Sequence, residues 1–224
     1  MRDSLRLLIN RSKLEGNMKK SIALATVAAL FAAPAMAETV KLGVLLGFTG
    51  PIESLTPDMA AGAEMAMAEA SKSGKFMGGS TIESVRGDST CVDAAAATAT
   101  AERLITSDKV AAIMGADCSG VTTAVLQNVA TAKGIVMISP SATSPALSTI
   151  QDNGLFFRTS PSDARQGQVL AEVLKERGVK SAAISYTNND YGKGLADSIQ
   201  SNFEAVGGKA VSYTHLTLPT SYAV

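Results

Sequence analysis

A short apolar run in the middle of the chain ends abruptly in small polar residues: Gly134-Ile135-Val136-Met137-Ile138-Ser139-Pro140-Ser141-Ala142-Thr143. The apolar part has the length of a buried strand, and the prolines at Pro140 and Pro145 stiffen the segment that follows. Such a segment is either a connecting turn or a rim that presents hydroxyls and backbone groups to a ligand. The surrounding sequence decides between the two.

The same pattern of a strand followed by a loop recurs upstream and alternates with helical segments. Strands are predicted at residues 40–46, 82–86, 110–114 and 135–138, and helices at 58–70, 92–106 and 119–132. This alternation indicates a parallel sheet with crossover helices. In such open sheets, ligands bind beyond the carboxyl ends of the strands, where the strand order reverses. We therefore expect the loops after the first, third and fourth strands to lie on one edge.

A second α/β unit is predicted to begin near Asn153. The motif Ser160-Pro161-Ser162-Asp163 predicts a helix start, with Ser160 as the N-cap and Pro161 at the first helical position. A strand is predicted at residues 180–185 after this helix. The next helix has an apolar face made of Leu195, Ile199, Phe203 and Val206.

The expected fold class is therefore α/β, with a parallel sheet and helices on both of its faces. Residues 38–152 are predicted to form a nearly whole N-terminal lobe, and residues 153–211 only the start of a second lobe.

The N-terminal segment has the order of a secretory signal. Basic residues at Lys19 and Lys20 precede an apolar run over residues 22–33 and small residues that end at Ala37. We expect residues 18–37 to be a signal peptide cleaved after Ala37, with a buried N-terminal helix as the alternative. The apolar run is too short to span a bilayer. We interpret residues 1–17 as translated upstream sequence.

The C-terminal segment differs in character from the hundred residues before it. Residues 212–224 lose the Ala, Gly and acidic composition and resemble a translated sequencing adapter. We interpret them as a non-native tail on a truncated protein, which as it stands is expected to capture ligand weakly or not at all. The one histidine, His215, lies in this tail and is given no functional weight.

Charge and motifs exclude several classes of function. The chain has 20 basic and 20 acidic residues, without a basic patch, so nucleic acid is not an expected partner. The acidic residues show no paired spacing and are predicted to be solvated. The nucleotide-binding glycine motifs and the G-x-S-x-G elbow are absent, and a serine triad would need His215. We therefore expect no enzyme activity and no cofactor.

The chain has two cysteines, Cys91 and Cys118. In an exported protein they are expected to form a disulfide, with two free buried thiols as the alternative. Neither a C-x-x-C spacing nor a nearby histidine suggests a metal. Because both cysteines follow predicted strands, a bridge would tie down the loop that starts the third helix.

Hydroxyl residues follow the predicted strands. Ser119 lies at a helix start, where free N–H groups favour a ligand carboxylate, although an ordinary N-cap is the equal alternative. Thr143 could bind the same carboxylate, and the Ser141 carbonyl could accept from an ammonium group; a simple turn is the alternative. Tyr191 could close over a ligand or pack at a helix start.

At these residues the sequence resembles the periplasmic branched-chain-amino-acid-type solute-binding proteins of ABC importers, which have the type I periplasmic binding fold. The resemblance covers residues 38–210 approximately. The matching motifs are Thr49-Gly50-Pro51, Cys91, Gly115-Ala116-Asp117-Cys118-Ser119, Ile138-Ser139-Pro140-Ser141-Ala142-Thr143, Phe157-Arg158-Thr159 and Asp190-Tyr191-Gly192-Lys193-Gly194.

The resemblance implies two lobes that clamp a ligand. Ser119 and Thr143 would hold the ligand carboxylate, the loop of Ser141 and Ala142 would face the ammonium group, and Tyr191 would line the second lobe. Cys91 and Cys118 would form the disulfide.

The implied function is an exported, periplasmic binding component that delivers an amino acid or related small carboxylate to an ABC permease in the inner membrane. A periplasmic ligand sensor that acts through a receptor is the alternative. The sequence departs from the family at residues 52–56, where an aromatic residue is usual and Ile52-Glu53-Ser54-Leu55-Thr56 stands instead.

Overall fold

The structure, a computed structural model, describes residues 37–216. The predicted upstream segment, the predicted signal peptide up to residue 36, and residues 217–224 lie outside this range. Within residues 37–216, no helix has both the length and the hydropathy that crossing a membrane requires.

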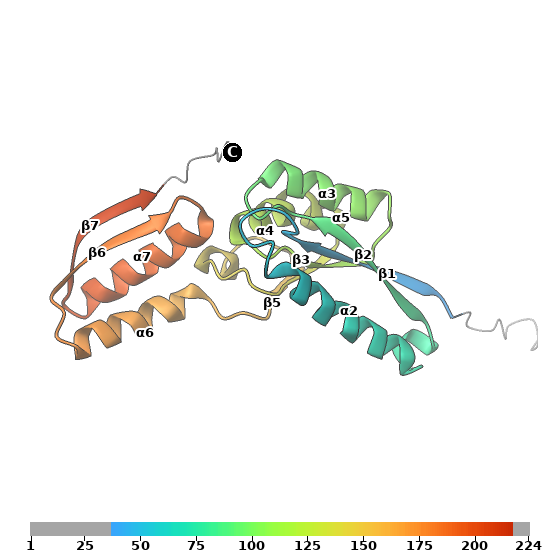
Figure 1. The fold of residues 1–224 in the computed structure, drawn as a ribbon, viewed down its shortest axis with the longest axis horizontal. Helices are drawn as coiled ribbons and strands as arrows, with labels where there is room; N and C mark the ends of the chain where they lie inside the picture. The colour runs from blue at the N-terminus through green and yellow to red at the C-terminus, as the bar shows by residue number, and fades with distance from the viewer. Residues whose placement is uncertain (1–36, 217–224) are drawn as a thin grey trace, which may run out of the picture. The chain divides into compact units, whose positions relative to one another are not determined.

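A five-stranded parallel sheet forms the centre of the first α/β unit (Figure 1). Its strands lie in the order β2-β1-β3-β4-β5. Because the chain goes from β1 to β2 on one side and then returns to β3 on the other, the strand order reverses between β1 and β3. The strands are β1 (Thr39–Leu46), β2 (Thr81–Asp88), β3 (Ala112–Gly115), β4 (Val136–Ser139) and β5 (Phe156–Arg158).

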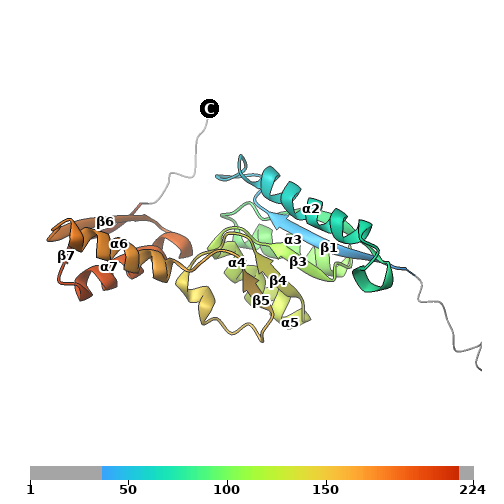
Figure 2. The same ribbon diagram turned by 90° about the horizontal axis from the view of Figure 1, so that it is seen from below.

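Helices cover both faces of this sheet, as predicted. Adjacent residues of β1 show this directly, because side chains alternate between faces along a strand. Val44 and Leu46 pack in a small core with Ala60 of α2, whereas Leu45 joins a larger core with residues of α3 and α4. Figures 1 and 2 show α2 on one face of the sheet and α3 and α4 on the other. The helices are α2 (Thr56–Lys72), α3 (Ala94–Thr106), and a continuous helical run of α4 (Ser119–Val125), the π-helix η2 (Leu126–Ala130) and α5 (Thr131–Lys133). Two short 3₁₀ helices are η1 (Phe76–Gly78) and η3 (Pro145–Ser148).

The second α/β unit contains two helices and a separate two-stranded parallel sheet. Its helices α6 and α7 approach closely, since a Cβ atom at Gly167 would lie 2.2 Å from Ser198 Oγ. Phe203 of α7 is fully buried, as expected for its predicted apolar face. The elements are α6 (Asp163–Glu176), β6 (Ser181–Thr187), α7 (Asp190–Ala205) and β7 (Lys209–Leu216).

The predicted start of α6 is wrong. Ser162, not Ser160, is the N-cap, and its hydroxyl accepts from the Ala164 N–H at 3.2 Å. Ser160 instead donates to the Pro140 carbonyl at 2.6 Å. It therefore holds the loop after β4, and Pro161 precedes the helix.

The predicted boundary at residue 211 falls inside a strand. β7 runs to Leu216 and pairs with β6 in parallel, with a register shift next to Ala182. The interpretation of residues 212–224 as a non-native tail stays a prediction.

Candidate functional site

The carboxyl ends of the central strands are aligned. Leu45 pairs with Gly115, and Met114 pairs with Ile138, so β1, β3 and β4 end in nearly the same row. Their following loops therefore start side by side, at the reversal of strand order. We call residues 47–50, 116–118 and 140–144 the carboxyl edge.

Ser119 joins two loops of this edge. Its Oγ accepts from the backbone N–H of Thr143 at 3.2 Å and of Ser144 at 3.1 Å, and only 2% of the residue is exposed. The N-cap alternative is wrong, because α4 begins at Ser119 and Cys118 is the N-cap residue. A hydroxyl that accepts twice keeps its own proton to donate, and residues 37–216 supply no acceptor for it.

Ser141 has a free acceptor. Its hydroxyl donates to the Asp117 carbonyl at 2.9 Å. The Ser141 carbonyl accepts no hydrogen bond from the part of the chain that the structure describes. The carbonyls around it each accept at least one: those of Ser139, Pro140, Ala142, Thr143 and Ser144. The carbonyl that was predicted to face an ammonium group is thus the uncommitted one.

Both hydrogen-bond donors of Thr143, its backbone N–H and its hydroxyl, already have acceptors within the protein. Its N–H goes to Ser119, and its Oγ1 donates to Asp163 Oδ2 at 2.8 Å. A threonine hydroxyl has one proton, so a direct hydrogen bond from Thr143 to a ligand carboxylate would break the contact with Asp163.

Ala142 is buried in the larger core, so only its backbone could meet a ligand. Its carbonyl accepts from Arg158 Nη1 at 3.2 Å, and the same nitrogen donates to the Ser144 carbonyl at 2.9 Å. Burial lowers the pKa of Arg158, although the nearby Asp163 carboxylate opposes this shift. Arg158 thus supports the loop from β5, a role that the sequence motif alone did not reveal.

Asp117 is another residue whose role the sequence did not reveal. It is only 2% exposed, and its carboxylate accepts from Gly47 N, Ser89 Oγ and Cys118 N. The expectation that the acidic residues are solvated is wrong here and for Asp163, which is also buried. All three groups that contact Asp117 are uncharged donors. Across residues 37–216, no group of three or more His, Cys, Asp or Glu side chains is arranged to hold a metal ion.

The two cysteines form a disulfide. The Cα atoms of Cys91 and Cys118 are 5.2 Å apart, and the bridge closes a sequence separation of 27 residues. The alternative of two free thiols is therefore wrong. Since Cys118 immediately precedes α4, the bridge fixes the start of that helix to the loop after β2.

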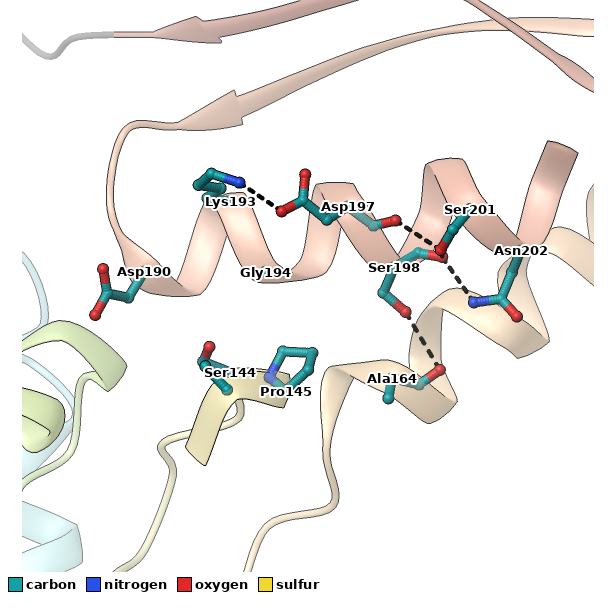
Figure 3. A pocket seen from close by; sticks show the side chains of 11 residues that line it. Ser144, Pro145, Ala164, Asp190, Lys193, Gly194, Asp197, Ser198, Ser201 and Asn202 are labelled. Carbon is teal, nitrogen blue, oxygen red and sulfur yellow. Dashed lines mark hydrogen bonds and ion pairs between the residues drawn. The ribbon is translucent and has the colours of Figure 1, made fainter. Parts of the chain in front are cut away.

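Tyr191 lies in the first turn of α7 and is 45% exposed. The same half of α7 borders the carboxyl edge, because a Cβ atom at Gly194 would lie 2.9 Å from Pro145 Cδ and 3.0 Å from Ser144 Oγ. Figure 3 shows Gly194 opposite Pro145, in a groove of about 580 Å³. Tyr191 is not among the residues that line this groove.

A second groove, of about 440 Å³, follows α6 and contains Thr143, Asp163, Val169 and Leu170. The structure thus brings Ser119, Ser141 and Thr143 together but does not place them in one groove with Tyr191.

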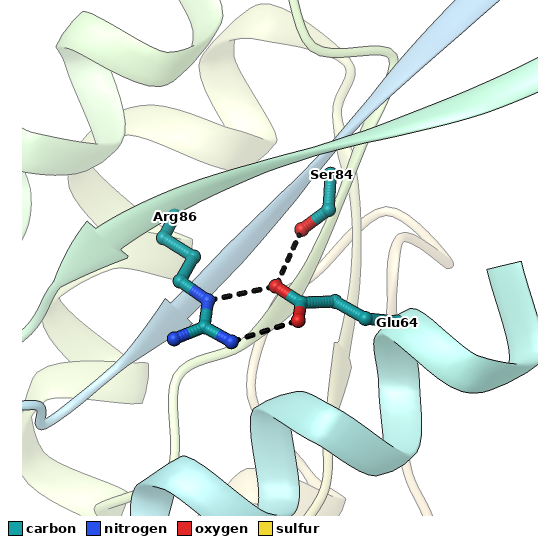
Figure 4. Close-up of polar contacts among 3 residues, drawn as sticks. All are labelled: Glu64, Ser84 and Arg86. Atoms are coloured by element: carbon teal, nitrogen blue, oxygen red, sulfur yellow. Dashed lines mark hydrogen bonds and ion pairs between the residues drawn. The ribbon is translucent and has the colours of Figure 1, made fainter. Parts of the chain in front are cut away.

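Arg86 contacts the loop after β1 and is itself held by an ion pair. Arg86 of β2 forms a two-pronged ion pair with Glu64 of α2 at 2.7 Å for each contact, and Ser84 donates to the same carboxylate (Figure 4). The hydrogen bonds from Arg86 outweigh desolvation and lower the pKa of Glu64. The Arg86 guanidinium also lies 5.3 Å from the ring centre of Phe48, a residue of the carboxyl edge.

The segment that departs from the family pattern presents an aliphatic side chain. Leu55 occupies the N-cap position of α2 and is 61% exposed. The next residue, Thr56, is buried and donates to the Gly47 carbonyl at 3.0 Å. Leu55 therefore adjoins the carboxyl edge.

The chain belongs to the periplasmic binding protein family, because the profile of that family matches residues 39–222. It is 30% identical to the Leu/Ile/Val-binding protein of Citrobacter freundii over 203 residues, which are 90% of this chain and 54% of that protein. The chain spans about half the length of the curated relatives that it matches.

Solved structures show the same likeness. A branched-chain amino acid transporter substrate-binding protein from Streptococcus pneumoniae, in complex with isoleucine, gives a TM-score of 0.70 at 29% identity and covers 83% of this chain and 52% of its own. A solute-binding protein of an ABC transporter from R. palustris, in complex with benzoate, gives a TM-score of 0.69 at 26% identity. The match covers 81% of this chain and 49% of that protein. The α/β fold is therefore that of type I periplasmic binding proteins. These relatives are binding proteins and not enzymes, as expected for this chain.

Proposed function

We propose that the protein is the exported solute-binding component of an ABC importer and captures an amino acid or a related small carboxylate. Its family and the ligands bound in similar solved structures support this class. Isoleucine and benzoate, the molecules bound by the two similar structures, both carry a carboxylate. A carboxylate is therefore the feature that a common site would recognise.

The observation that carries the proposal is the pairing of a free donor with a free acceptor on the carboxyl edge. Ser119 keeps a hydroxyl proton, and the Ser141 carbonyl accepts no hydrogen bond from residues 37–216. The first turn of α4 adds backbone N–H groups that favour a negative charge. A carboxylate at Ser119 and an ammonium group at Ser141 would satisfy both.

This arrangement favours an α-amino acid over benzoate, because benzoate has no donor for the Ser141 carbonyl. An exposed leucine, Leu55, adjoins the same edge and favours an apolar ligand side chain. We therefore infer leucine, isoleucine or valine as the preferred ligands. Tyr191 of the second α/β unit is proposed to cover the ligand when the lobes close about their hinge.

The test is a titration monitored by amide chemical shifts in ¹H–¹⁵N NMR spectra, which detects even weak binding. L-Isoleucine is expected to shift the amide signals of Ser119, Gly120 and Thr143, and benzoate to shift them less. Ser119→Ala should weaken isoleucine binding by about 1–3 kcal/mol, the cost of an unpaired group. Ser73→Ala, at the exposed end of α2, is the matched control and should leave binding unchanged.

Shifts confined to other segments, or equal responses to isoleucine and benzoate, would refute the proposed site. Delivery to a permease is tested separately by uptake of labelled isoleucine in cells that lack the gene. Reduced uptake supports transport, whereas normal uptake with a lost response to isoleucine supports the sensor alternative.

A further inference from the structure

A buried carboxylate underlies the carboxyl edge. Asp117 lies between the end of β3 and the start of α4 and does not need to contact ligand in the proposed function. Its Oδ2 accepts from Gly47 N at 2.6 Å, and its Oδ1 accepts from Ser89 Oγ at 3.0 Å and Cys118 N at 2.9 Å.

These three donors come from different parts of the fold. Gly47 follows β1, Ser89 follows β2, and Cys118 is the N-cap residue of α4. Gly47 and Ser89 are 70 and 28 residues away from Asp117 in sequence. A single side chain therefore ties the reversal point between β1 and β3 to the helix that begins with Ser119.

Packing around the carboxylate leaves little freedom. Ser89 is fully buried, and a Cβ atom at Gly47 would lie 3.2 Å from both Asp117 Oδ2 and Cys91 Cβ. Asp117 takes part in none of the three ion pairs found within residues 37–216. A buried charge without a countercharge is costly unless hydrogen bonds satisfy it, so the three donors are what holds it there.

We propose that Asp117 is a positioning residue: it fixes the start of α4, and with it the Ser119 hydroxyl, relative to the loop after β1. Its effect on affinity rests on the proposed ligand role of Ser119. Its effect on the geometry of the edge does not. A loop that is held in place before the ligand arrives lowers the ordering cost of binding.

The charged form matters because all three partners donate. In Asp117→Asn, one amide orientation sets the NH₂ group against Gly47 N–H, and the other sets it against Cys118 N–H. In either orientation, the amide NH₂ group and a backbone N–H group, both donors, face each other at close range. The substitution thus keeps the size of the side chain and breaks one contact.

Hydrogen exchange of the ligand-free full chain, followed by mass spectrometry, tests the positioning role. In Asp117→Asn, amides in residues 43–50 and 115–122 should exchange about tenfold faster or more, because their local opening costs less free energy. Ser89→Ala removes one donor and should give a smaller rise in the same segments, which keeps the test decisive if Asp117→Asn does not fold.

The matched control is Val110→Ala, which removes apolar packing just before β3, at the amino end of that strand. It should lower the melting temperature while leaving exchange in residues 115–122 close to the wild-type rate. Equal exchange in Asp117→Asn and Val110→Ala, or wild-type rates in both Asp117→Asn and Ser89→Ala, would overturn the inference.

An L-isoleucine titration of the same variants adds the functional arm. Asp117→Asn should weaken binding about tenfold relative to Val110→Ala, because Ser119 is no longer held in place. Equal affinities in these two variants would overturn the link to Ser119. If the wild-type chain does not respond to isoleucine, ligand binding by this half-length chain is refuted, and the exchange measurement still decides whether Asp117 positions the edge.

Discussion

Thr143 and Asp163 are joined by two hydrogen bonds that run in opposite directions. The Thr143 hydroxyl donates to the Asp163 carboxylate at 2.8 Å, and the Asp163 N–H donates to the Thr143 carbonyl at 2.9 Å. Since Asp163 is the first residue of α6, this pair attaches the carboxyl edge to the helix that opens the second α/β unit.

Removing the Thr143 hydroxyl should destabilise the chain. Thr143→Val leaves the buried Asp163 carboxylate without one donor, which should cost about 1–3 kcal/mol in urea unfolding. Thr143→Ser keeps the hydroxyl and serves as the control, with a smaller loss. An unfolding free energy of Thr143→Val equal to that of the wild type would mean that the hydrogen bond does not stabilise the junction, since valine keeps the methyl group and lacks only the hydroxyl.

Arg158 should not be replaceable by lysine. Its guanidinium donates to the Ala142 and Ser144 carbonyls and to Ser148 Oγ, and one ammonium group cannot reproduce that fork. Arg158→Lys should lower the unfolding free energy by about 1–3 kcal/mol and speed exchange of the Ser144 amide. Arg165→Lys, at an exposed position of α6, should have almost no effect.

The disulfide should contribute substantially to stability. Replacing Cys91 and Cys118 together by serine should cost about 2–5 kcal/mol, because the unfolded chain regains the freedom that the closed loop removes. A reductant should bring the wild-type protein to the level of the variant and leave the variant unchanged. A variant as stable as the oxidised protein would contradict this expectation.

Two helical glycines should respond in opposite directions to alanine. At Gly167 the new Cβ would lie 2.6 Å from the Ser198 carbonyl carbon, so Gly167→Ala should force α6 and α7 apart and cost about 1–3 kcal/mol or more. At Gly62 of α2 nothing lies within 4 Å, and alanine should stabilise the helix by up to about 1 kcal/mol. Thermal unfolding of the two variants measures both effects.

Asp88 should contribute stability that depends on pH. Burial alone would raise its pKa, but hydrogen bonds from Thr49 and Thr90 outweigh burial and lower the pKa below the ordinary 3.8. Because the folded pKa is the lower one, the stabilisation is present above the ordinary pKa and is lost as the pH falls through the folded pKa. The difference in unfolding free energy between wild type and Asp88→Asn should be constant from about pH 5 to 7 and shrink below about pH 4. A difference that stays constant down to pH 2 would contradict this assignment.

The order of strands and helices could be predicted because each parallel strand is a short apolar run followed by a helix. The positions of Ser119 and Thr143 on one edge follow from that order. The burial of Asp117 could not be predicted, because its donors include Gly47, a residue 70 positions away. The shift of the α6 cap from Ser160 to Ser162 likewise depends on a distant group, the Pro140 carbonyl.

The π-helix η2 explains how the helical run of α4, η2 and α5 keeps the same face toward the sheet. Apolar or small buried residues recur every fourth position in this run, at Val121, Val125 and Val129. In a regular α-helix, a four-residue repeat drifts by about 40° each time, so the third valine would turn away from the sheet. The wider turn over Leu126–Ala130 rotates less per residue and corrects this drift. The helical run therefore keeps one face in the larger core from Val121, near the carboxyl edge, to Val129.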